Sequence, residues 1–302
     1  MKKQLKKHIR SAVKGRILFD EPMASRTSFS IGGPAEVWVE PKNVSSLAET
    51  IRFSRKKGIP LTVIGAGSNV LVRDKGLRGI VVSLSSVHFR IIDRTGEQSF
   101  RVSSGVKLHK LLNITRNNEL GGLEFTVGIP GTLGGAIIMN AGGKDKNISD
   151  LVTKVDLMDR SGELVSLDRR DINFGYRFSG LDDYVILGAH LHLQKRPQDL
   201  IDRDISNYSR LKKSFQELKL PNAGSIFKNP GHLAFSAGRL IELSGLKGKT
   251  IGNIQVSTKH ANFIVNRGGG RARDVMKLIE LVRRKIKKDH NVDLELELKV
   301  IG

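Results

Sequence analysis

The alternation of hydrophobic and polar positions in the first part of the chain predicts strands around a single helix. Residues 35–41 alternate like a half-buried strand and stop at a proline. Leu47 and Ile51 are spaced as one face of a helix, and Gly58 follows as a C-cap. These patterns predict strands at 35–41, 61–64, 70–72 and 79–84 and a helix at 45–57.

The middle of the chain carries the patterns of a second unit. Leu108, Leu111 and Leu112 form a helical stripe, and the turn at 159–162 between two apolar runs predicts a hairpin. Residues 128–136 are too rich in glycine for a helix interior, so we expect a loop there. The predicted elements are strands at 89–92, 100–103, 154–158, 163–167 and 185–194 and a helix at 106–117.

A third unit follows residues 195–205, where Pro197 and several charged side chains predict a linker. Its predicted elements are a strand at 262–266, an amphipathic helix at 272–288 and an alternating strand at 294–300. This order of elements predicts an α+β fold. The expected organisation is a basic lead-in at 1–20, helical or loose, followed by units at 21–87, 88–196 and 205–302.

Composition narrows the class of protein. Hydrophobic residues make up 39% of the chain, which is typical of a soluble globular protein. The absence of cysteine excludes disulfides, a thiolate nucleophile, Fe–S clusters and cysteine-based zinc sites, and we expect no metal site. No run of 18 apolar residues exists, and charges interrupt residues 11–16, so neither a membrane span nor a secretion signal is expected. We therefore expect a cytoplasmic protein.

The formal net charge of +21 indicates either a polyanionic partner or a generally basic background. The excess is spread out: residues 1–16 hold seven Lys and Arg, and residues 267–288 hold nine against two acids. Aromatic residues are only 5% of the chain, and no zinc-finger, RRM or KH pattern is present. We expect no nucleic-acid partner.

The turn between the predicted strands at 61–64 and 70–72 has the chemistry of an anion site. Its glycines let backbone N–H groups converge, and its serine and asparagine add donors. This turn is not a Rossmann motif, because the third glycine of a dinucleotide-binding fingerprint is missing and a strand follows it. It is not a P-loop either, because no Gly-Lys-Ser/Thr sequence follows. A plain structural turn is the alternative. The residues are Gly65, Ala66, Gly67, Ser68 and Asn69.

The second glycine-rich stretch, 128–143, predicts a wall against which something flat or phosphorylated lies. So many glycines cost conformational entropy, and the stretch also contains apolar residues that a solvated loop does not need. A long surface loop is the alternative. The candidate cofactor-binding residues here are Gly128, Pro130, Gly131, Gly134, Asn140 and Ala141.

Six motifs, taken in order, resemble one family from about residue 21 onward. They are the segments 27–35, 65–69, 128–143, 176–179 (Tyr-Arg-Phe-Ser), 223–230 (Ala-Gly-Ser-Ile-Phe-Lys-Asn-Pro) and 294–297 (Leu-Glu-Leu-Glu). In this order they resemble the shorter type of UDP-N-acetylenolpyruvoylglucosamine reductases, or UDP-N-acetylmuramate dehydrogenases, of bacterial peptidoglycan synthesis.

The resemblance implies a two-part FAD-binding domain of the vanillyl-alcohol-oxidase and p-cresol-methylhydroxylase type at 21–87 and 88–196. A C-terminal α+β substrate-binding domain at 205–302 is implied to close over the substrate. FAD is then expected to lie non-covalently between the first two parts, with its pyrophosphate on residues 65–69. NADPH is the implied co-substrate and UDP-N-acetylglucosamine enolpyruvate the implied substrate. A monomer is expected, although the sequence itself does not show the oligomeric state.

The implied reaction reduces an enol ether: a hydride from NADPH reaches C3 by way of FAD, and a general acid protonates C2. Arg177 matches the family arginine that binds the carboxylate, and Ser225 matches the proton donor. Glu297 matches the second glutamate of the closing motif. It is either protonated, paired with Arg177 or used to orient the substrate.

Four further residues are candidate substrate contacts, each with a structural alternative. Tyr176 packs in the site or forms its wall, and Lys228 is a diphosphate or sugar contact or a solvated charge. Asn229 follows in the same motif. His260 is a contact or a structural histidine. Because this chain resembles the shorter type, the residue that covers the UDP moiety stays open.

Two rival functions share the glycine loops: a flavoprotein oxidase of the same fold, and a flavoprotein that binds a polyanion. An oxidase has no need of Ser225 and Glu297 in the family motifs. A binding protein that lacks enzymatic activity would not need the glycine loops. The motifs in the third unit therefore favour the reductase.

Overall fold

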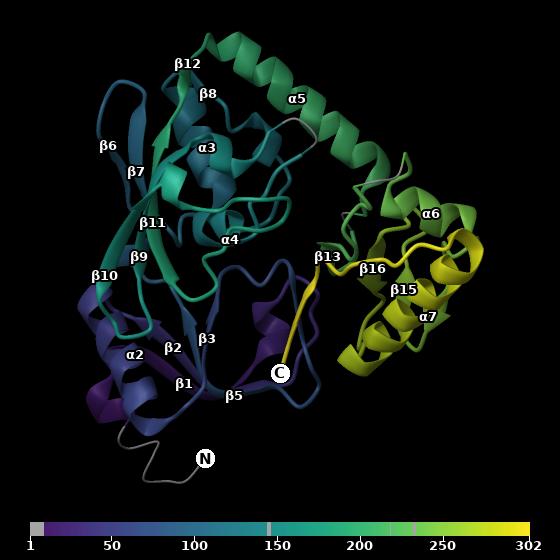
Figure 1. The fold of residues 1–302 in the computed structure, drawn as a ribbon, viewed down its shortest axis with the longest axis horizontal. Helices are drawn as coiled ribbons and strands as arrows, with labels where there is room; N and C mark the ends of the chain where they lie inside the picture. Colours follow the sequence, from purple (N-terminus) through teal and green to yellow (C-terminus); the bar gives the residue numbers. More distant parts are fainter. Residues whose placement is uncertain (1–8, 144–145, 218, 232–233) are drawn as a thin grey trace. The chain divides into compact units, whose positions relative to one another are not determined.

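A computed structural model describes residues 9–143, 146–217, 219–231 and 234–302. The chain divides into two compact units. Figure 1 labels helices and strands of both units. Unit 1 comprises Met1–Phe19, Glu36–Ala66 and Gly79–Arg210, and unit 2 comprises Asp20–Ala35, Gly67–Arg78 and Leu211–Gly302. The segments predicted from the sequence, 21–87, 88–196 and 205–302, are each continuous, whereas each of these units combines three stretches of chain. The predicted segments stay a prediction.

The first sheet has four strands in the order β1-β2-β5-β3, with β3 parallel to β5. Helix α2 (Val44–Lys57) buries Leu47 and Ile51 with the strand residues Val37 and Ile80. The Asn43 side chain caps the start of α2, and Gly58 ends it with a φ of 61°. The strands are β1 (Gly15–Pro22), β2 (Pro34–Pro41), β3 (Leu61–Ile64) and β5 (Leu77–Ser83). The helix predicted at 45–57 and the strands predicted at 35–41, 61–64 and 79–84 are confirmed, whereas the strand predicted at 70–72 forms but belongs to unit 2.

The prediction of a loose or helical lead-in is wrong for residues 15–20, which belong to strand β1. Ile17 and Phe19 pack partly buried against the core of this sheet, whereas Arg16 and Asp20 are exposed. This alternation is a strand signal that the positive charge of the segment obscured. Residues 9–12 are helical, and the rest of the predicted lead-in, 1–8, lies outside the described residues.

The second sheet of unit 1 has five antiparallel strands in the order β10-β9-β11-β7-β6. Helices α3 (Leu108–Asn117) and α4 (Leu133–Ile138) bury Leu111 and Ile137 in the same core as Val102 and Ala189. The strands are β6 (Ile92–Arg94), β7 (Ser99–Ser103), β9 (Val152–Met158), β10 (Leu164–Asp168) and β11 (Val185–His192); a short pair, β8 (Leu120–Gly121) and β12 (Gln194–Lys195), accompanies them.

Two predictions for this part are corrected. The strand expected at 89–92 begins only at Ile92, because Phe89 ends a 3-10 turn, Val87–Phe89, that buries its ring. The expected loop at 128–136 contains most of helix α4, in which glycine is tolerated because the backbone packs closely on its neighbours.

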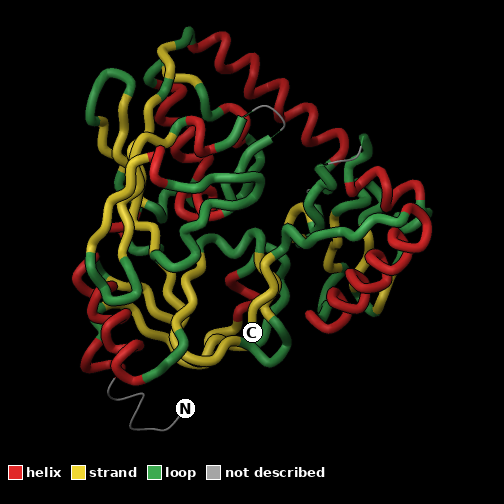
Figure 2. The backbone as a smooth tube through the Cα atoms, viewed as in Figure 1, coloured by secondary structure: helices red, strands yellow, loops and turns green. Residues whose placement is uncertain are grey.

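The linker predicted at 195–205 is also wrong, because the continuous helix α5 (Gln198–Phe215) begins at residue 198 (Figure 2). Ile201 is fully buried, and Ile205 and Tyr208 pack partly buried in the core of the five-stranded sheet. Their spacing of four and three residues is that of one helix face. Pro197 stands just before the helix, where a proline is compatible with the first turn.

Unit 2 contains a four-stranded antiparallel sheet in the order β13-β16-β15-β14 and a parallel pair, β17 with β4. Leu240 of α6 and Val275 and Ile279 of α7 share one buried core with the strand residue Ile264. The elements are β4 (Val70–Val72), β13 (Asn222–Ser225), α6 (Ala237–Leu243), β14 (Thr250–Ile251), β15 (Ile254–Val256), β16 (Phe263–Asn266), α7 (Ala272–His290) and β17 (Lys299–Ile301).

The predicted helix at 272–288 and the strand at 262–266 are confirmed within one or two residues. The strand predicted at 294–300 is regular only from Lys299, although Leu294 and Leu298 are buried as the alternation requires. Among the described residues, no helix combines the length and the apolar composition needed to cross a bilayer.

Candidate active site

The glycine-rich segment 128–136 lies against Gly65 within unit 1. A Cβ atom built on Gly65 would lie 3.0 Å from Oγ1 of Thr132, which is closer than an ordinary contact. Gly65, Ala66 and Gly128 are exposed or half-buried, so their main chain is accessible to a ligand. Gly65 and Ala66 of the first predicted glycine motif therefore form a single surface with the segment 128–136 of the second.

Helix α4 begins on this surface, and its close packing explains its glycines. Oγ1 of Thr132 accepts a hydrogen bond from the Gly135 N–H at 3.4 Å and caps the helix. The Gly134 N–H donates to the Ser104 carbonyl at 2.9 Å, and a Cβ on Gly134 would lie 2.9 Å from the Ser104 Cβ. Only glycine fits at position 134 without moving the neighbouring backbone.

Two side chains brace the end of the glycine loop against the Tyr-Arg-Phe-Ser motif. The buried Asn140 amide donates to the Gly175 carbonyl at 2.9 Å and accepts from the Ser149 N–H at 3.2 Å. In return, Nη2 of Arg177 donates to the Gly142 carbonyl at 3.2 Å. The structure thus brings together Asn140 and Arg177, which are far apart in the sequence, within unit 1.

The motif itself is a tight turn. Gly175 and Phe178 exchange backbone hydrogen bonds at 2.9 and 3.2 Å, and Arg177 has a φ of 55°. Tyr176 is 51% exposed, and the Arg177 guanidinium carbon lies 5.1 Å from the centre of its ring. The turn therefore presents an aromatic ring and a cation side by side.

The second half of the first glycine turn, 67–69, belongs to unit 2. Gly67 has a φ of 63°, as expected for a tight turn, but it is buried. A Cβ on Gly67 would lie 2.2 Å from the Arg26 carbonyl oxygen. A larger residue there must disturb the protein's own backbone, so Gly67 is required by the fold independently of any ligand.

Gly67→Ala should lower the free energy of unfolding by at least about 2 kcal/mol, because left-handed strain and a backbone clash add. Gly58→Ala is the matched control: its φ is 61°, but no atom lies within 4 Å of the added Cβ. This control should cost only about 1 kcal/mol. Urea denaturation of both variants gives the comparison, and equal losses would show that the close approach to Arg26 is unimportant.

In unit 2, the Ser225 motif runs alongside the closing Leu-Glu-Leu-Glu segment. The Glu297 N–H donates to the Ile226 carbonyl at 2.9 Å, and the Lys228 N–H donates to the Glu295 carbonyl at 2.8 Å. The Glu297 carbonyl in turn accepts from the Asn69 amide at 3.0 Å. The main chain next to Ser225, the main chain of Glu297 and the side chain of Asn69, predicted from three separate motifs, are therefore linked by hydrogen bonds.

The side chains of the same motif have distinct partners. Nζ of Lys228 lies 3.0 Å from Oε1 of Glu295, an exposed carboxylate, so this lysine carries an ion pair. Oδ1 of Asn229 accepts from the N–H of Ala237, the first residue of α6, at 3.1 Å. Within the described residues the Ser225 hydroxyl, which is half-buried, makes no side-chain hydrogen bond.

His260 is packed between aromatic rings and bonded to the chain. Its ring centre lies 4.5 Å from that of Phe263 and 6.0 Å from that of Phe215. Nδ1 of His260 accepts from the Asn262 N–H at 3.2 Å. Burial is the main cause that lowers the pKa of His260 below its ordinary value of 6.5.

This pKa shift predicts a pH-dependent contribution to stability. Above about pH 6.5 His260 is neutral in both the folded and the unfolded chain; below it the unfolded chain takes up the proton first. The free energy of unfolding should therefore fall with decreasing pH, by at most about 1.4 kcal/mol per pH unit from this group. Denaturation of the wild type and of His260→Gln between about pH 7.5 and about pH 5 measures it. A difference between the two that does not change with pH would contradict the prediction.

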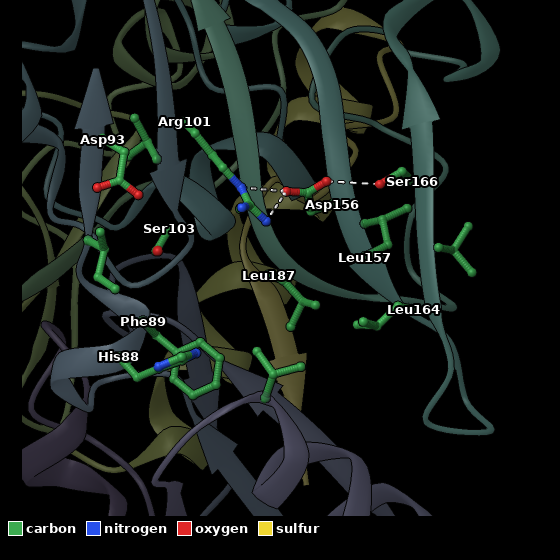
Figure 3. Close-up of a pocket in the computed structure, with 15 residues that line it drawn as sticks. His88, Phe89, Asp93, Arg101, Ser103, Asp156, Leu157, Leu164, Ser166 and Leu187 are labelled. Carbon is green, nitrogen blue, oxygen red and sulfur yellow. Dashed lines mark hydrogen bonds and ion pairs between the residues drawn. The ribbon is translucent and has the colours of Figure 1, made fainter. Parts of the chain in front are cut away.

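None of these candidate residues lines the cavity shown in Figure 3. It has a volume of about 320 Å³ and is walled by Arg101, Asp156 and Ser166, on the face of the five-stranded sheet opposite to the one that α4 covers. Burial opposes ionisation of Asp156, but bonds from Ser166 and Arg101 outweigh it and hold the pKa below its usual range.

Comparison with known proteins gives the family. Residues 35–168 match the family model of an FAD binding domain, and residues 216–301 match that of the UDP-N-acetylenolpyruvoylglucosamine reductase C-terminal domain. A UDP-N-acetylenolpyruvoylglucosamine reductase of Syntrophus aciditrophicus is 40% identical over 99% of this chain and 96% of its own. The chain belongs to the UDP-N-acetylenolpyruvoylglucosamine reductase family.

Solved structures agree with this membership. The reductase of Thermus caldophilus is 33% identical, covers 95% of this chain and 98% of its own, and superposes with a TM-score of 0.81. A BBE-like protein of Physcomitrella patens, 17% identical over 63% of this chain and 44% of its own, shares the fold with a TM-score of 0.50. The predicted resemblance and fold class, an FAD-binding domain followed by the C-terminal domain of this reductase family, are confirmed.

The structure also shows residues that sequence reasoning missed. Thr132 touches Gly65 and caps α4, and Asn262 bonds to the backbone beside the Ser225 motif. On α5, burial lowers the pKa of Lys212 to about 8. The threonine that stands just before the apolar and glycine residues of α4 was a readable cap signal. No local sequence pattern indicated the role of Asn262. Lys212 was missed because helix α5 was not predicted.

Proposed function

We propose that this protein is an NADPH-dependent UDP-N-acetylmuramate dehydrogenase that serves peptidoglycan precursor synthesis. It reduces the enolpyruvyl group of UDP-N-acetylglucosamine enolpyruvate to the lactyl group of UDP-N-acetylmuramate. The observation that carries the proposal is the match to a reductase at 40% identity over nearly the whole of both chains.

The residues of unit 1 fit FAD. Gly65, Ala66 and Gly128 are accessible and carry no large side chain, and Gly65 lies directly against Thr132. A phosphate can approach such a surface closely enough to bond to backbone N–H groups. We propose that Gly65, Ala66, Gly128, Pro130, Gly131 and Gly134 of unit 1 hold the cofactor, with Asn140 and Ala141 completing the loop. Gly67, Ser68 and Asn69, which belong to unit 2, are proposed as the rest of the cofactor-binding turn.

The overall chemistry adds H₂ across a double bond. The enolpyruvyl CH₂ carbon, C3, receives a hydride and becomes CH₃; C2 receives a proton; NADPH becomes NADP⁺. Bound FAD supplies the capacity to accept the hydride from NADPH and deliver it to C3. The chain itself must bind the substrate carboxylate, stabilise the negative charge that develops next to C2, and supply the proton.

We propose that Arg177 binds the substrate carboxylate. Its guanidinium is always charged, offers two parallel donors, and is already held by the Gly142 carbonyl and by the turn at 175–178. Charge that spreads from C2 into the carboxylate is thereby stabilised without reorganisation of the side chain. Tyr176, which lies beside the guanidinium, is proposed as a wall of the substrate site.

We propose that Ser225 donates the proton to C2. Its hydroxyl is half-buried and uncommitted within the described residues, while the backbone that follows it is tied down on both sides. Glu297 is the proposed partner that assists the proton transfer or orients the substrate, because its main chain bonds to Ile226 next to Ser225. Lys228, Asn229 and His260 are proposed substrate contacts of lesser weight.

One experiment tests the proposal. The purified protein should carry about one FAD per chain, released by acid precipitation, since cysteine is absent and neither glycine loop holds a histidine for a covalent link. Without oxygen, NADPH should bleach the flavin absorbance and UDP-N-acetylglucosamine enolpyruvate should restore it. NADH is run in parallel. Bleaching that only oxygen reverses would favour an oxidase instead.

A further inference from the structure

We infer that Asn262 is a positioning residue for the proton donor: its side chain sets the path of the backbone that carries Ser225. The inference rests on the proposed function, in which Ser225 protonates C2. The Asn262 side chain bonds to the main chain of Phe227 and not to Ser225 itself. It acts on the residues that follow Ser225.

Asn262 holds two consecutive residues with three hydrogen bonds. Its Oδ1 accepts from the Phe227 N–H at 3.0 Å, and its Nδ2 donates to the Phe227 carbonyl at 2.8 Å. Its main-chain carbonyl accepts from the Ile226 N–H at 2.9 Å. Asn262 is 4% exposed, so water does not compete effectively for these groups.

The opposite side of the same backbone is occupied by the closing segment. The Ile226 carbonyl accepts from the Glu297 N–H, and the Lys228 N–H donates to the Glu295 carbonyl. The backbone from Ile226 to Lys228 is thus held between Asn262 and residues 295–297. The location of Ser225 relative to Glu297 therefore depends on a clamp with two sides.

On its N-terminal side Ser225 pairs with Phe263 in the ladder between β13 and β16, and the Gly224 N–H donates to Oδ1 of Asn222 at 3.0 Å. Gly224 precedes it with a φ of 74° and with no atom within 4 Å of where its Cβ would be. The ladder between β13 and β16 is irregular between Asn222 and Ser225. Asn262 therefore adds, on the C-terminal side of Ser225, a restraint that the irregular ladder before it does not supply.

The chemistry of the clamp requires an asparagine. The amide offers one acceptor and one donor, as the N–H and carbonyl of Phe227 demand. The substitution Asn262→Asp would place a carboxylate oxygen against the Phe227 carbonyl, and Asn262→Ala would leave both buried backbone groups without a partner. His260 and its bond to the Asn262 N–H fix the orientation of the strand start from which the amide projects.

The test separates the two half-reactions by stopped-flow absorbance in Asn262→Ala and Asn262→Asp. Reduction of the flavin by NADPH should keep the wild-type rate. Re-oxidation by UDP-N-acetylglucosamine enolpyruvate should slow about 10–100-fold, because small misplacements of a reacting group have effects of this size. The dissociation constant of the substrate should change less than about threefold, because neither variant removes a group that contacts the substrate.

Asn266→Ala is the matched control. Asn266 lies on the adjoining strand β16, is 2% exposed and also bonds to backbone, at Phe29, Gly268 and Gly270, but not to the Ser225 motif. It should lose stability without a selective loss in re-oxidation. Hydrogen exchange of the Phe227 amide should accelerate in Asn262→Ala and not in Asn266→Ala, a readout that is independent of activity.

A double variant gives the decisive comparison. If Asn262 acts through Ser225, adding Asn262→Ala to Ser225→Ala should not slow re-oxidation further. Additive losses, or a re-oxidation rate in Asn262→Ala equal to that in Asn266→Ala, would overturn the inference. A wild-type flavin that the substrate fails to re-oxidise would instead refute the proposed function, and the inference would fall with it.

Discussion

Ser225→Ala should slow re-oxidation of the flavin by the enolpyruvyl substrate about 10²–10⁴-fold, the usual contribution of a general acid. Reduction of the flavin by NADPH involves no proton at C2 and should keep its rate. Substrate affinity should change little, since one hydroxyl contributes only about 0.5–1.5 kcal/mol net. Anaerobic stopped-flow absorbance measures both rates on the same preparation.

Ser225→Cys is the matched variant, because a thiol keeps a transferable proton at the same position. It should retain more re-oxidation activity than Ser225→Ala. A second signature is exchange of hydrogen at C3: when protonation at C2 is blocked, hydride return scrambles the C3 hydrogens of unreacted substrate. If Ser225→Ala slows both half-reactions equally, the serine is structural and the assignment is wrong.

Arg177→Lys should lower kcat/KM for the enolpyruvyl substrate about 10²–10³-fold, the typical loss when one preorganised donor to a developing anion is removed. Lysine keeps the charge but loses the two-point geometry, and it cannot reproduce the 3.2 Å bond to the Gly142 carbonyl at the same time. The loss should appear in both substrate affinity and the re-oxidation rate. Flavin reduction by NADPH should stay near wild type.

Arg170→Lys is the control for Arg177→Lys, since Arg170 lies in the same unit with a side chain that is 84% exposed. It should leave both half-reactions unchanged. Substrates without the carboxylate would sharpen the test, because they should not distinguish Arg177→Lys from the wild type. Unchanged kcat/KM for the natural substrate in Arg177→Lys would exclude carboxylate binding by this residue.

Elements with one strong local signal could be predicted from the sequence. Helix α2 had an apolar stripe and a glycine cap, α7 had the same stripe with acid at its start, and the β9–β10 hairpin had a turn signal. The prediction failed for elements in which charge or glycine content masked the hydrophobic pattern. Charge concealed β1 and α5, and glycine concealed α4, whose packing against Ser104 favours the residue that is otherwise poor in helices.

The site divides in the same way. Its motifs are local strings, so their residues could be named from the sequence. Their arrangement depends on contacts over long separations: Asn140 to Gly175 and Asn262 to Phe227 across 35 residues, and Asn69 to Glu297 across 228. No local pattern encodes such pairs, which is why Asn262 was found only in the structure.

Unit 2 is assembled from three stretches of chain, and this has a consequence for folding during synthesis. Strand β4 pairs with β17, which is synthesised much later. The Asp74 carboxylate likewise accepts hydrogen bonds from the N–H groups of Ala272 and Arg273, which follow 198 and 199 residues later. Phe29 and Leu71 belong to the same buried core as the helix α7 that follows much later.

The ribosome therefore releases the early pieces of unit 2 long before their partners exist. Until α7 emerges, Phe29 and Leu71 lack part of the core in which they are buried, and a nascent chain exposes apolar surface that a chaperone can bind. A message cut before the codons of β17 would yield a chain in which β4 lacks its partner strand. The early segments of unit 2 therefore complete their pairing only after residues 299–301 have been synthesised.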